Sequence, residues 1–251
     1  MTPSRSVVVE HHVPAVEAVL AAVAHDVARL GRVVIGPGSE QVSPASAVHA
    51  GDDGFGVHAG TVCLVRVVAG TARGRPLRAP AGRTTRPTSD RVREAIFSML
   101  TSMDVIEGAR VLDLYAGSGA LGIEALSRGA ESVVFVDNDP AAVAAVRANL
   151  SVLGPASARA VVLRADAVQY LAGAPEVDLV LADPPYSFDG WEQLLDALVG
   201  RANLLVAETG QAWQPGPGWE TVKVKRYGGT LVTVVQPPSR LRSPLRQEGE
   251  A

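Results

Sequence analysis

The stretch Val111-Leu-Asp-Leu-Tyr-Ala-Gly-Ser-Gly-Ala-Leu-Gly122 decides the fold, because it runs from a buried strand through a glycine-rich loop into a helix. Gly117, Gly119 and Gly122 satisfy the pattern G-x-G-x-x-G, in which glycines let the backbone turn tightly and approach a ligand. Asp137 ends the next β-branched run, at the distance from the loop where an acid holds a ribose hydroxyl. The stretch therefore predicts a nucleotide-like cofactor at the carboxyl end of a parallel sheet.

This loop alone fits a dinucleotide-dependent dehydrogenase and an S-adenosylmethionine enzyme about equally. Asp113 favours the second, because an acid in the strand before the loop does nothing for a negative pyrophosphate. The same acid suits a ligand that carries a cationic sulfonium and an ammonium group. The loop therefore indicates S-adenosylmethionine as the cofactor.

Short β-branched runs alternate with helical patterns around this loop, which predicts a mainly parallel α/β sheet with helices on both faces. Only Gly228-Gly229 separates two further strand-like runs near the end of the chain, so these runs should pair as an antiparallel hairpin. The expected fold is thus Rossmann-like, with a seven-stranded sheet. The expected strands are 110–115, 132–137, 160–164, 177–182, 204–207, 220–227 and 230–235, and the expected helices after the loop are 120–128, 140–153 and 190–199.

The most specific motif is Asp183-Pro-Pro-Tyr186, which follows a buried strand. Two prolines fix the backbone, so the Asp183 carboxylate and the Pro184 carbonyl can be aimed at one point. If two acceptors hold the hydrogens of a base amino group, the nitrogen becomes pyramidal and its lone pair is no longer delocalised into the ring. Asp183 would then take the proton that the amine loses on methylation. Tyr186 would stack on the base. The motif predicts methyl transfer to an exocyclic base nitrogen, with no metal required.

Residues 66–93 carry eight arginines against one acid, Asp90, although the whole chain has a net charge of −3. Arginine forks pair with phosphate oxygens, so this segment predicts contact with a nucleic-acid backbone. Arg83 and Arg86 lie on a Gly/Pro loop that precedes a helix expected to start near Thr88. The expected contacts are Arg73, Arg75, Arg83, Arg86 and Arg93.

Residues 65–235 resemble the RsmD-type family of bacterial methyltransferases, which modify the guanine exocyclic amine N2 in 16S ribosomal RNA. The resemblance is carried by 66–70 with 73–77, by the distinctive stretch 86–97 (RPTSDRVREAIF), by 112–130, and by the Asp183-Pro-Pro-Tyr motif. It implies a class I S-adenosylmethionine-dependent methyltransferase that acts on 16S ribosomal RNA, within a small-subunit particle.

Carried over residue by residue, the resemblance implies cofactor contacts at several positions and places the segment 86–93 beside the active site. Asp166 and Ala167 are expected at the adenine ring, and target-base handling falls to Asp183, Pro184 and Tyr186. The full expected cofactor set is Asp113, Tyr115, Gly117, Gly119, Asp137, Asn138, Asp166 and Ala167.

The sequence predicts an N-terminal extension (1–62), partly helical and then flexible, a methyltransferase domain (63–238) and a frayed tail (239–251). A single cysteine, Cys63, excludes a disulfide framework and a multi-cysteine metal site, and it fits a cytoplasmic protein. No run reaches the ~18 apolar residues of a membrane span, so no membrane partner is expected.

Two alternatives stay open at this point. A DNA adenine-N6 or cytosine-N4 methyltransferase can carry the same Asp-Pro-Pro-Tyr motif, although such enzymes usually add a target-reading domain. A nucleotide-binding oxidoreductase, or a non-catalytic RNA-binding module, belongs to another class, and Asp113 and Asp183 argue against both.

Overall fold

The computed structural model describes residues 65–80 and 89–238. The helix and the flexible segment expected within 1–62 lie outside the described residues, as do Arg83, Arg86 and the tail.

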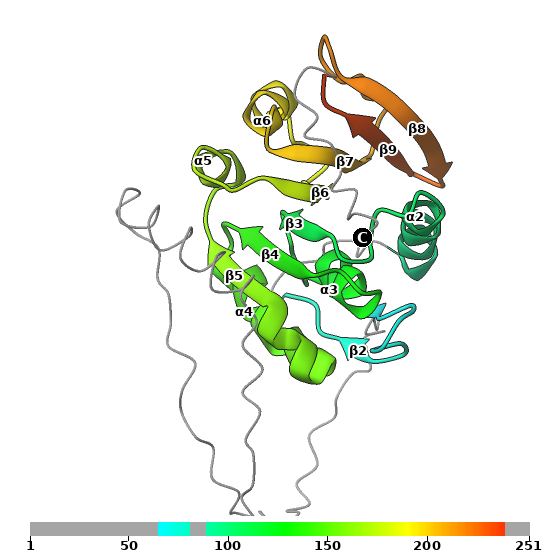
Figure 1. Ribbon diagram of the computed structural model, residues 1–251, viewed down its shortest axis with the longest axis vertical. Coiled ribbons are helices and arrows are strands. Elements are labelled where there is room, and N and C mark those ends of the chain that lie inside the picture. The colour runs from blue at the N-terminus through cyan, green and yellow to red at the C-terminus, as the bar shows by residue number, and fades with distance from the viewer. Residues whose placement is uncertain (1–64, 81–88, 239–251) are drawn as a thin grey trace, which may run out of the picture.

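The main sheet consists of β3 (Arg110–Leu114), β4 (Ser132–Asp137), β5 (Ala160–Arg164), β6 (Val177–Ala182), β7 (Ala202–Thr209), β8 (Glu220–Tyr227) and β9 (Thr230–Gln236). Their order across the sheet is β5-β4-β3-β6-β7-β9-β8 (Figure 1). The strands from β5 to β7 run parallel to one another, while β9 lies antiparallel between β7 and β8. The predicted fold class is therefore confirmed, together with its antiparallel hairpin.

Helices cover both faces of the sheet (Figure 1). On one face lie α2 (Asp90–Ser102), α3 (Ala120–Ser127) and α4 (Pro140–Asn149), which pack into a single apolar cluster with the strands. On the other face lie α5 (Ala167–Leu171) and α6 (Trp191–Leu198), which build a second cluster. A buried central sheet of this kind exposes only its strand ends, so functional side chains are expected there.

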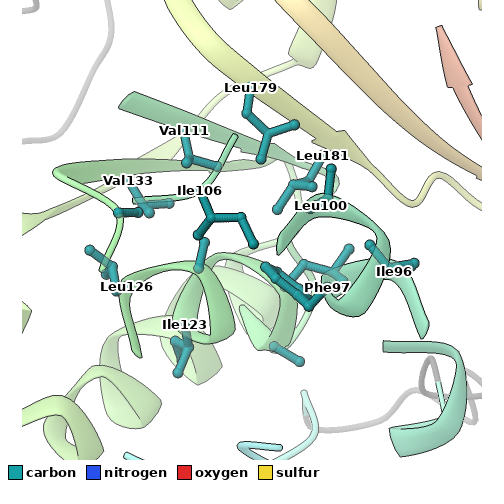
Figure 2. Close-up of a cluster of buried hydrophobic side chains, with 14 of the residues drawn as sticks. Ile96, Phe97, Leu100, Ile106, Val111, Ile123, Leu126, Val133, Leu179 and Leu181 are labelled. Atoms are coloured by element: carbon teal, nitrogen blue, oxygen red, sulfur yellow. The ribbon is translucent and has the colours of Figure 1, made fainter. Parts of the chain in front are cut away.

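The first cluster fixes α2 against the sheet (Figure 2). Ser89 caps this helix by accepting a hydrogen bond from the Val92 N–H, and the apolar side chains of the helix face inward. Phe97 and Leu100 are fully buried, and burial of each such side chain contributes about 1.5–3 kcal/mol. The packing of α2 against the sheet thus fixes the position of its first residue, Asp90.

Two short elements differ from the expected helices. The helix expected over 140–153 ends at Asn149, and a 3₁₀ segment, η1 (Leu150–Arg159), follows it. Gly154 lies inside η1 with a φ of 56°, and Pro155 follows, so the backbone cannot continue as an α-helix. The helix α5 was not expected, because its five residues are too few to show a helical period.

A small hairpin, β1 (Val65–Arg66) with β2 (Pro76–Leu77), precedes the sheet. Glu124 of α3 holds one side of it, because its carboxylate accepts hydrogen bonds from the Val68 and Ala69 N–H groups at 2.7 and 2.9 Å. The hairpin is therefore attached directly to the helix that follows the glycine-rich loop.

The turn of this hairpin lies against the C-terminal end of α3. The Thr71 N–H donates to the Ser127 carbonyl at 2.8 Å, and the Ser127 hydroxyl accepts from the Ala72 N–H at 2.9 Å. Gly70 passes so close that an added Cβ would lie 1.9 Å from the Ser127 carbonyl oxygen. Only glycine fits at this crossing.

Replacing Gly70 by alanine is expected to destabilise the protein more than the same change at Gly74. Both residues have a left-handed φ, +79° and +80°, so both variants carry backbone strain of about 1–2 kcal/mol. At Gly74 the new methyl group meets nothing within 4 Å, whereas at Gly70 it displaces the turn from α3 at a further cost of about 1–3 kcal/mol. Urea unfolding of the two variants measures the difference, and equal losses would contradict the docked turn.

None of the helices in the described ranges combines the length and apolar character needed to cross a membrane.

Candidate active site

The predicted cofactor residues meet at one edge of the sheet, because they follow the carboxyl ends of three neighbouring parallel strands, β3, β4 and β5. Asp113 lies in β3 with its side chain buried, and its carboxylate accepts a hydrogen bond from the Gly122 N–H at 2.9 Å. An added Cβ at Gly122 would lie 2.3 Å from the Phe135 ring and 2.9 Å from that carboxylate. The third glycine of the loop thus allows α3 to approach the buried acid.

Burial raises the pKa of the Asp113 carboxyl well above its usual range. The hydrogen bond from Gly122 opposes this shift, and the charge of Asp183 adds to it. A buried carboxylate of this kind is costly unless a cation compensates it. The site is therefore suited to a positively charged ligand.

Asp137 organises the glycine-rich loop from the end of β4. One carboxylate oxygen accepts from the Gly117 N–H at 2.9 Å and the other from the Asp139 N–H at 2.9 Å. Asn138 follows it and is exposed. After β5, the exposed Asp166 caps α5 by accepting a hydrogen bond from the Gln169 N–H at 3.0 Å. This hydrogen bond fixes the loop that, by the family resemblance, would contact the adenine ring.

Tyr115 adopts a left-handed backbone with a φ of 59°, which costs about 1–3 kcal/mol in a residue other than glycine. Its ring packs at 5.2 Å from the Phe188 ring. Burial, with a smaller contribution from the Asp166 charge, raises the pKa of Tyr115 to about 12. The side chain therefore stays a neutral phenol beside the loop at physiological pH.

The Asp183-Pro-Pro-Tyr loop follows β6, the strand next to β3. Pro184 is buried, Asp183 is partly buried, and a hydrogen bond of 2.8 Å from the Phe188 N–H to the Pro185 carbonyl closes the turn. Because β3 and β6 are paired neighbours, the loop adjoins the cofactor edge, and the charge of Asp183 acts on Asp113. The two parts of the predicted site are brought together.

The ring of Tyr186 is fixed by its neighbours but remains accessible to solvent. One face of its ring lies against Gly210, where an added Cβ would be 2.9 Å from the ring, and its hydroxyl lies 3.1 Å from the Thr230 hydroxyl. The side chain is nevertheless 56% exposed. A ring fixed at its edge and backed on one face, with so much of its surface free, is a platform for stacking a base.

A hollow of about 210 Å³ lies beside this platform and was not anticipated from the sequence. Phe188, Trp191 and Trp213 form a chain of ring contacts along it, with centroids 5.2 and 4.6 Å apart. Glu208 and the segment 209–212 complete its wall. These residues come from the ends of β6 and β7, so no local pattern in the sequence joins them.

The prediction that Arg93 contacts RNA is wrong, because its side chain is fully buried. It donates to Asp90 at 2.8 Å and to the Arg66 carbonyl, and it forms an ion pair of 3.9 Å with Glu124. Arg93 follows Val92 on the inner side of α2, and both residues are buried. The arginine therefore stabilises the hairpin and does not face the solvent.

Arg73 and Arg75 are exposed on the hairpin, but the turn that precedes them lies at Ser127, at the end of α3 away from the glycine-rich loop. Arg78 was not singled out in the sequence, although it lies nearer. Its backbone exchanges two hydrogen bonds of 2.8 Å with the side chain of Asn149.

The same Asn149 amide donates to the Ser118 carbonyl at 2.9 Å. The buried asparagine therefore ties the chain before the segment 81–88 to the glycine-rich loop. A partner 71 residues away could not be anticipated from sequence spacing.

Comparison with known proteins agrees with this geometry. A family model described as Conserved hypothetical protein 95 matches residues 65–236, more than half of the chain. The chain belongs to this family. It is the RsmD-type family expected from the motifs.

Two curated members of the RsmD-type family illustrate the likeness. The protein named Ribosomal RNA small subunit methyltransferase D of Haemophilus influenzae is 39% identical, over 53% of this chain and 70% of that protein. The YlbH protein of Bacillus subtilis is 45% identical, over 54% of this chain and 72% of its own length. Among solved structures, the Escherichia coli methyltransferase yhhF has a TM-score of 0.61 and 31% identity, covering 70% of this chain and 98% of its own.

Proposed function

We propose that this protein transfers a methyl group from S-adenosylmethionine to the exocyclic N2 amine of a guanine in 16S ribosomal RNA. The observation that carries the proposal is the juxtaposition of Asp183, Pro184 and the open ring of Tyr186 with the acid-lined loop after β3. Membership of the RsmD-type family supports the RNA substrate, as does the name of the Haemophilus influenzae relative. We further infer that the substrate is a small-subunit particle in the cytoplasm.

The described residues fit the proposed cofactor. Asp113 offers a buried acid to a cationic group, and Asp137 offers acceptor oxygens at the loop where a ribose would lie. Exposed Asn138 and Asp166, with Tyr115 and Ala167, would enclose the remainder. When bound, S-adenosylmethionine supplies an electrophilic methyl group, whose C–S electron pair leaves on sulfur.

The residues after β6 would prepare the target amine. Its lone pair is delocalised into the base, so the nitrogen reacts only when its hydrogens are drawn out of the ring plane. The Pro184 carbonyl and the Asp183 carboxylate would accept those two hydrogens, and Asp183 would take the proton released as the N–C bond forms. Tyr186 would hold the base by stacking, so that catalysis rests largely on positioning.

A DNA methyltransferase is the nearer alternative, yet in the described part of the chain the hairpin, sheet and helices leave no separate target-reading domain. Exposed Arg78, which Asn149 links to the glycine-rich loop, suits an RNA backbone beside the site, while exposed Arg73 and Arg75 remain proposed contacts farther along the hairpin. Arg83 and Arg86 remain proposed contacts from the segment that leads to α2. An oxidoreductase is disfavoured, since Asp113 lies where a pyrophosphate would be repelled.

The test is to incubate the protein with isotope-labelled S-adenosylmethionine and small ribosomal subunits that lack their native methylation. Digestion of the RNA and mass spectrometry then identify the labelled nucleoside. Label in N2-methylguanosine supports cofactor, reaction and base together. Label in another nucleoside would retain the mechanism but exclude guanine. If no label enters the RNA, the same assay is run on DNA, and label there would favour the alternative.

Replacing Asp113 by asparagine is expected to stabilise the ligand-free protein while weakening cofactor binding. The pKa of Asp113 is raised by folding, so the folded protein holds this proton more tightly than the unfolded chain, and stability falls as the pH rises above about 3.8. An amide keeps an acceptor for the Gly122 N–H without the cost of burying a negative charge, so the ligand-free variant should be more stable than the wild type at pH 7. Loss of the charge should lower the affinity for S-adenosylmethionine about 10- to 100-fold.

Thermal unfolding between pH 4 and pH 8, with calorimetric titration of the cofactor, measures both effects. The matched control is Asp196→Asn, because Asp196 is exposed on α6 and distant in the fold from the glycine-rich loop. An Asp113→Asn variant that binds the cofactor as tightly as the wild type would exclude the electrostatic role.

A further inference from the structure

The outermost strand of the sheet carries positive charge that the mechanism above does not use. β8 lies at the end of the sheet beside β9, and no strand in the described ranges pairs with its other side (Figure 1). All of its residues except Tyr227 are exposed. Lys223 and Lys225, the only two lysines of the chain, lie on this strand together with Arg226. These three residues form a basic edge.

The charges of the basic edge are not compensated within the described part of the chain. Arg110, Arg93 and Arg128 each form an ion pair with an acid, whereas the three cations of the basic edge have neither an ion pair nor a hydrogen bond there. The only acid within 210–238 is Glu220, which already has an interaction partner. Neighbouring charges of one sign attract an anionic partner.

The turn that follows the basic edge lies at the ligand-binding edge of the sheet. Leu231 of β9 pairs with Thr209, the last residue of β7, so β9 begins where the parallel strands end. Tyr227 of β8 pairs with Thr230, whose hydroxyl lies 3.1 Å from the hydroxyl of Tyr186. The basic edge therefore starts one residue before the pair that holds the stacking platform, and it leads away from the platform along β8.

The strand register gives the arrangement of the three cations. Lys223 pairs with Val234 and Lys225 with Val232, and both valines pack in the apolar cluster with α2 and α3. Directly paired residues of antiparallel strands share a face, so both lysines lie on the α2 side, about 7 Å apart along the strand. Arg226 follows on the opposite face. The open strand is thus bordered by cations on both sides.

A second copy of this chain is a poor partner for the basic edge. An antiparallel pair of β8 strands centred on Val224 would set Lys223 of one copy opposite Lys225 of the other, and like charges directly opposite are destabilising. The register also shifts between Thr221 and Lys223, which leaves Val222 unpaired and interrupts the ladder that a further strand would need. A polyanion needs no such ladder.

We propose that the basic edge binds the phosphate backbone of the RNA strand that flanks the target nucleotide; this inference rests on the proposed function. Lysine and arginine side chains bind phosphate oxygens, and the outward N–H groups of an edge strand are further donors. Sequence-specific proteins bind RNA mostly in single-stranded regions, whose backbone can follow an extended strand. Arg78 is linked through Asn149 to the loop after β3, on the other side of the Asp183 loop. The RNA would therefore cross the ligand-binding edge between Arg78 and β8.

The experiment measures how tightly the full chain binds a fluorescent fragment of small-subunit RNA that contains the nucleotide identified by the labelling assay. A neutral variant carries Lys223→Gln, Lys225→Gln and Arg226→Gln. Each lost contact with a single strand lowers the slope of log affinity against log salt by about 0.7, so the slope should become shallower by about 2. At 0.1 M salt the neutral variant should bind at least about 10-fold more weakly. Turnover at saturating RNA and the affinity for S-adenosylmethionine should not change.

A charge-retaining variant, with Lys223→Arg, Lys225→Arg and Arg226→Lys, should bind RNA as the wild type does. Arg110→Gln removes a cation at the amino end of β3, on the opposite edge of the sheet, and should leave the salt slope nearly unchanged.

The proposal is overturned if the neutral variant keeps the RNA affinity and the salt slope of the wild type. Self-association of that variant would then show that the cations only protect the edge strand. A loss confined to turnover at saturating RNA also overturns it. Failure of the proposed function is distinguishable, because the wild type itself would then place no label in RNA.

Discussion

Asp183→Ala is expected to abolish methyl transfer while leaving the affinity for S-adenosylmethionine nearly unchanged. The side chain follows β6 and, in the proposed mechanism, takes the proton from the target amine; loss of such a group lowers rates about 10²- to 10⁴-fold. The negative charge of Asp183 raises the pKa of Asp113, so its removal makes the cofactor acid easier to ionise. Cofactor binding should therefore not weaken.

Single-turnover methylation and calorimetric cofactor titration measure the two quantities separately. Asp183→Asn serves as the matched variant, because an amide keeps an acceptor oxygen but cannot take a proton at neutral pH. Near-complete loss of methylation in both variants would show that Asp183 accepts the proton. Activity retained by Asp183→Asn would show that Asp183 acts only as a hydrogen-bond acceptor for the amine. Equal losses of turnover and cofactor affinity would contradict the role given to Asp183.

The fold was predictable because the central parallel strands β3, β4 and β6 are buried along almost their whole length and end at loops rich in glycine, proline or acids. The β-branched runs before Gly117 and before Asp183 could be read as parallel strands, and Gly228-Gly229 marked the final hairpin. The sequence analysis did not say which of the last two strands pairs with β7. In the structure β9 pairs with it and is buried along almost all of its length, whereas β8 is exposed at the edge. Long-range pairing, not local pattern, decides which strand becomes the edge.

The candidate site was predictable where one segment carries a whole motif. The acid before the glycine-rich loop and the Asp183 motif are such cases, because the topology brings every strand's carboxyl end to one edge. Asn149 was missed because its hydrogen-bond partners, Arg78 and Ser118, lie on distant segments. The charge of residues 66–93 predicted a basic segment, but it did not show which arginine side chains are exposed and which are buried. Arg93 shares the charge of Arg73 yet lies inside the protein.

The buried arginine leads to the largest expected change in stability. Glu124 is fully buried in α3, where it forms an ion pair with Arg93, accepts from the Arg128 side chain at 2.7 Å and accepts from two backbone N–H groups of the hairpin. Glu124→Ala removes all of these acceptors and takes one of the two acids that face the buried charge of Arg93, the other being Asp90. Breaking a buried ion pair from one side costs about 3–5 kcal/mol.

An exposed ion pair in the same sheet provides the comparison. Arg110 of β3 pairs with Asp178 of β6 at 3.2 Å, with 43% and 30% of the two side chains exposed. Arg110→Gln should therefore cost less than about 1 kcal/mol, since solvent screens the charges. Urea unfolding monitored by circular dichroism compares the two variants. If Glu124→Ala destabilises the protein no more than Arg110→Gln does, the network is not what holds the hairpin on α3. A larger loss, together with early exchange of the Val68 and Ala69 amides, would show that the hairpin detaches first.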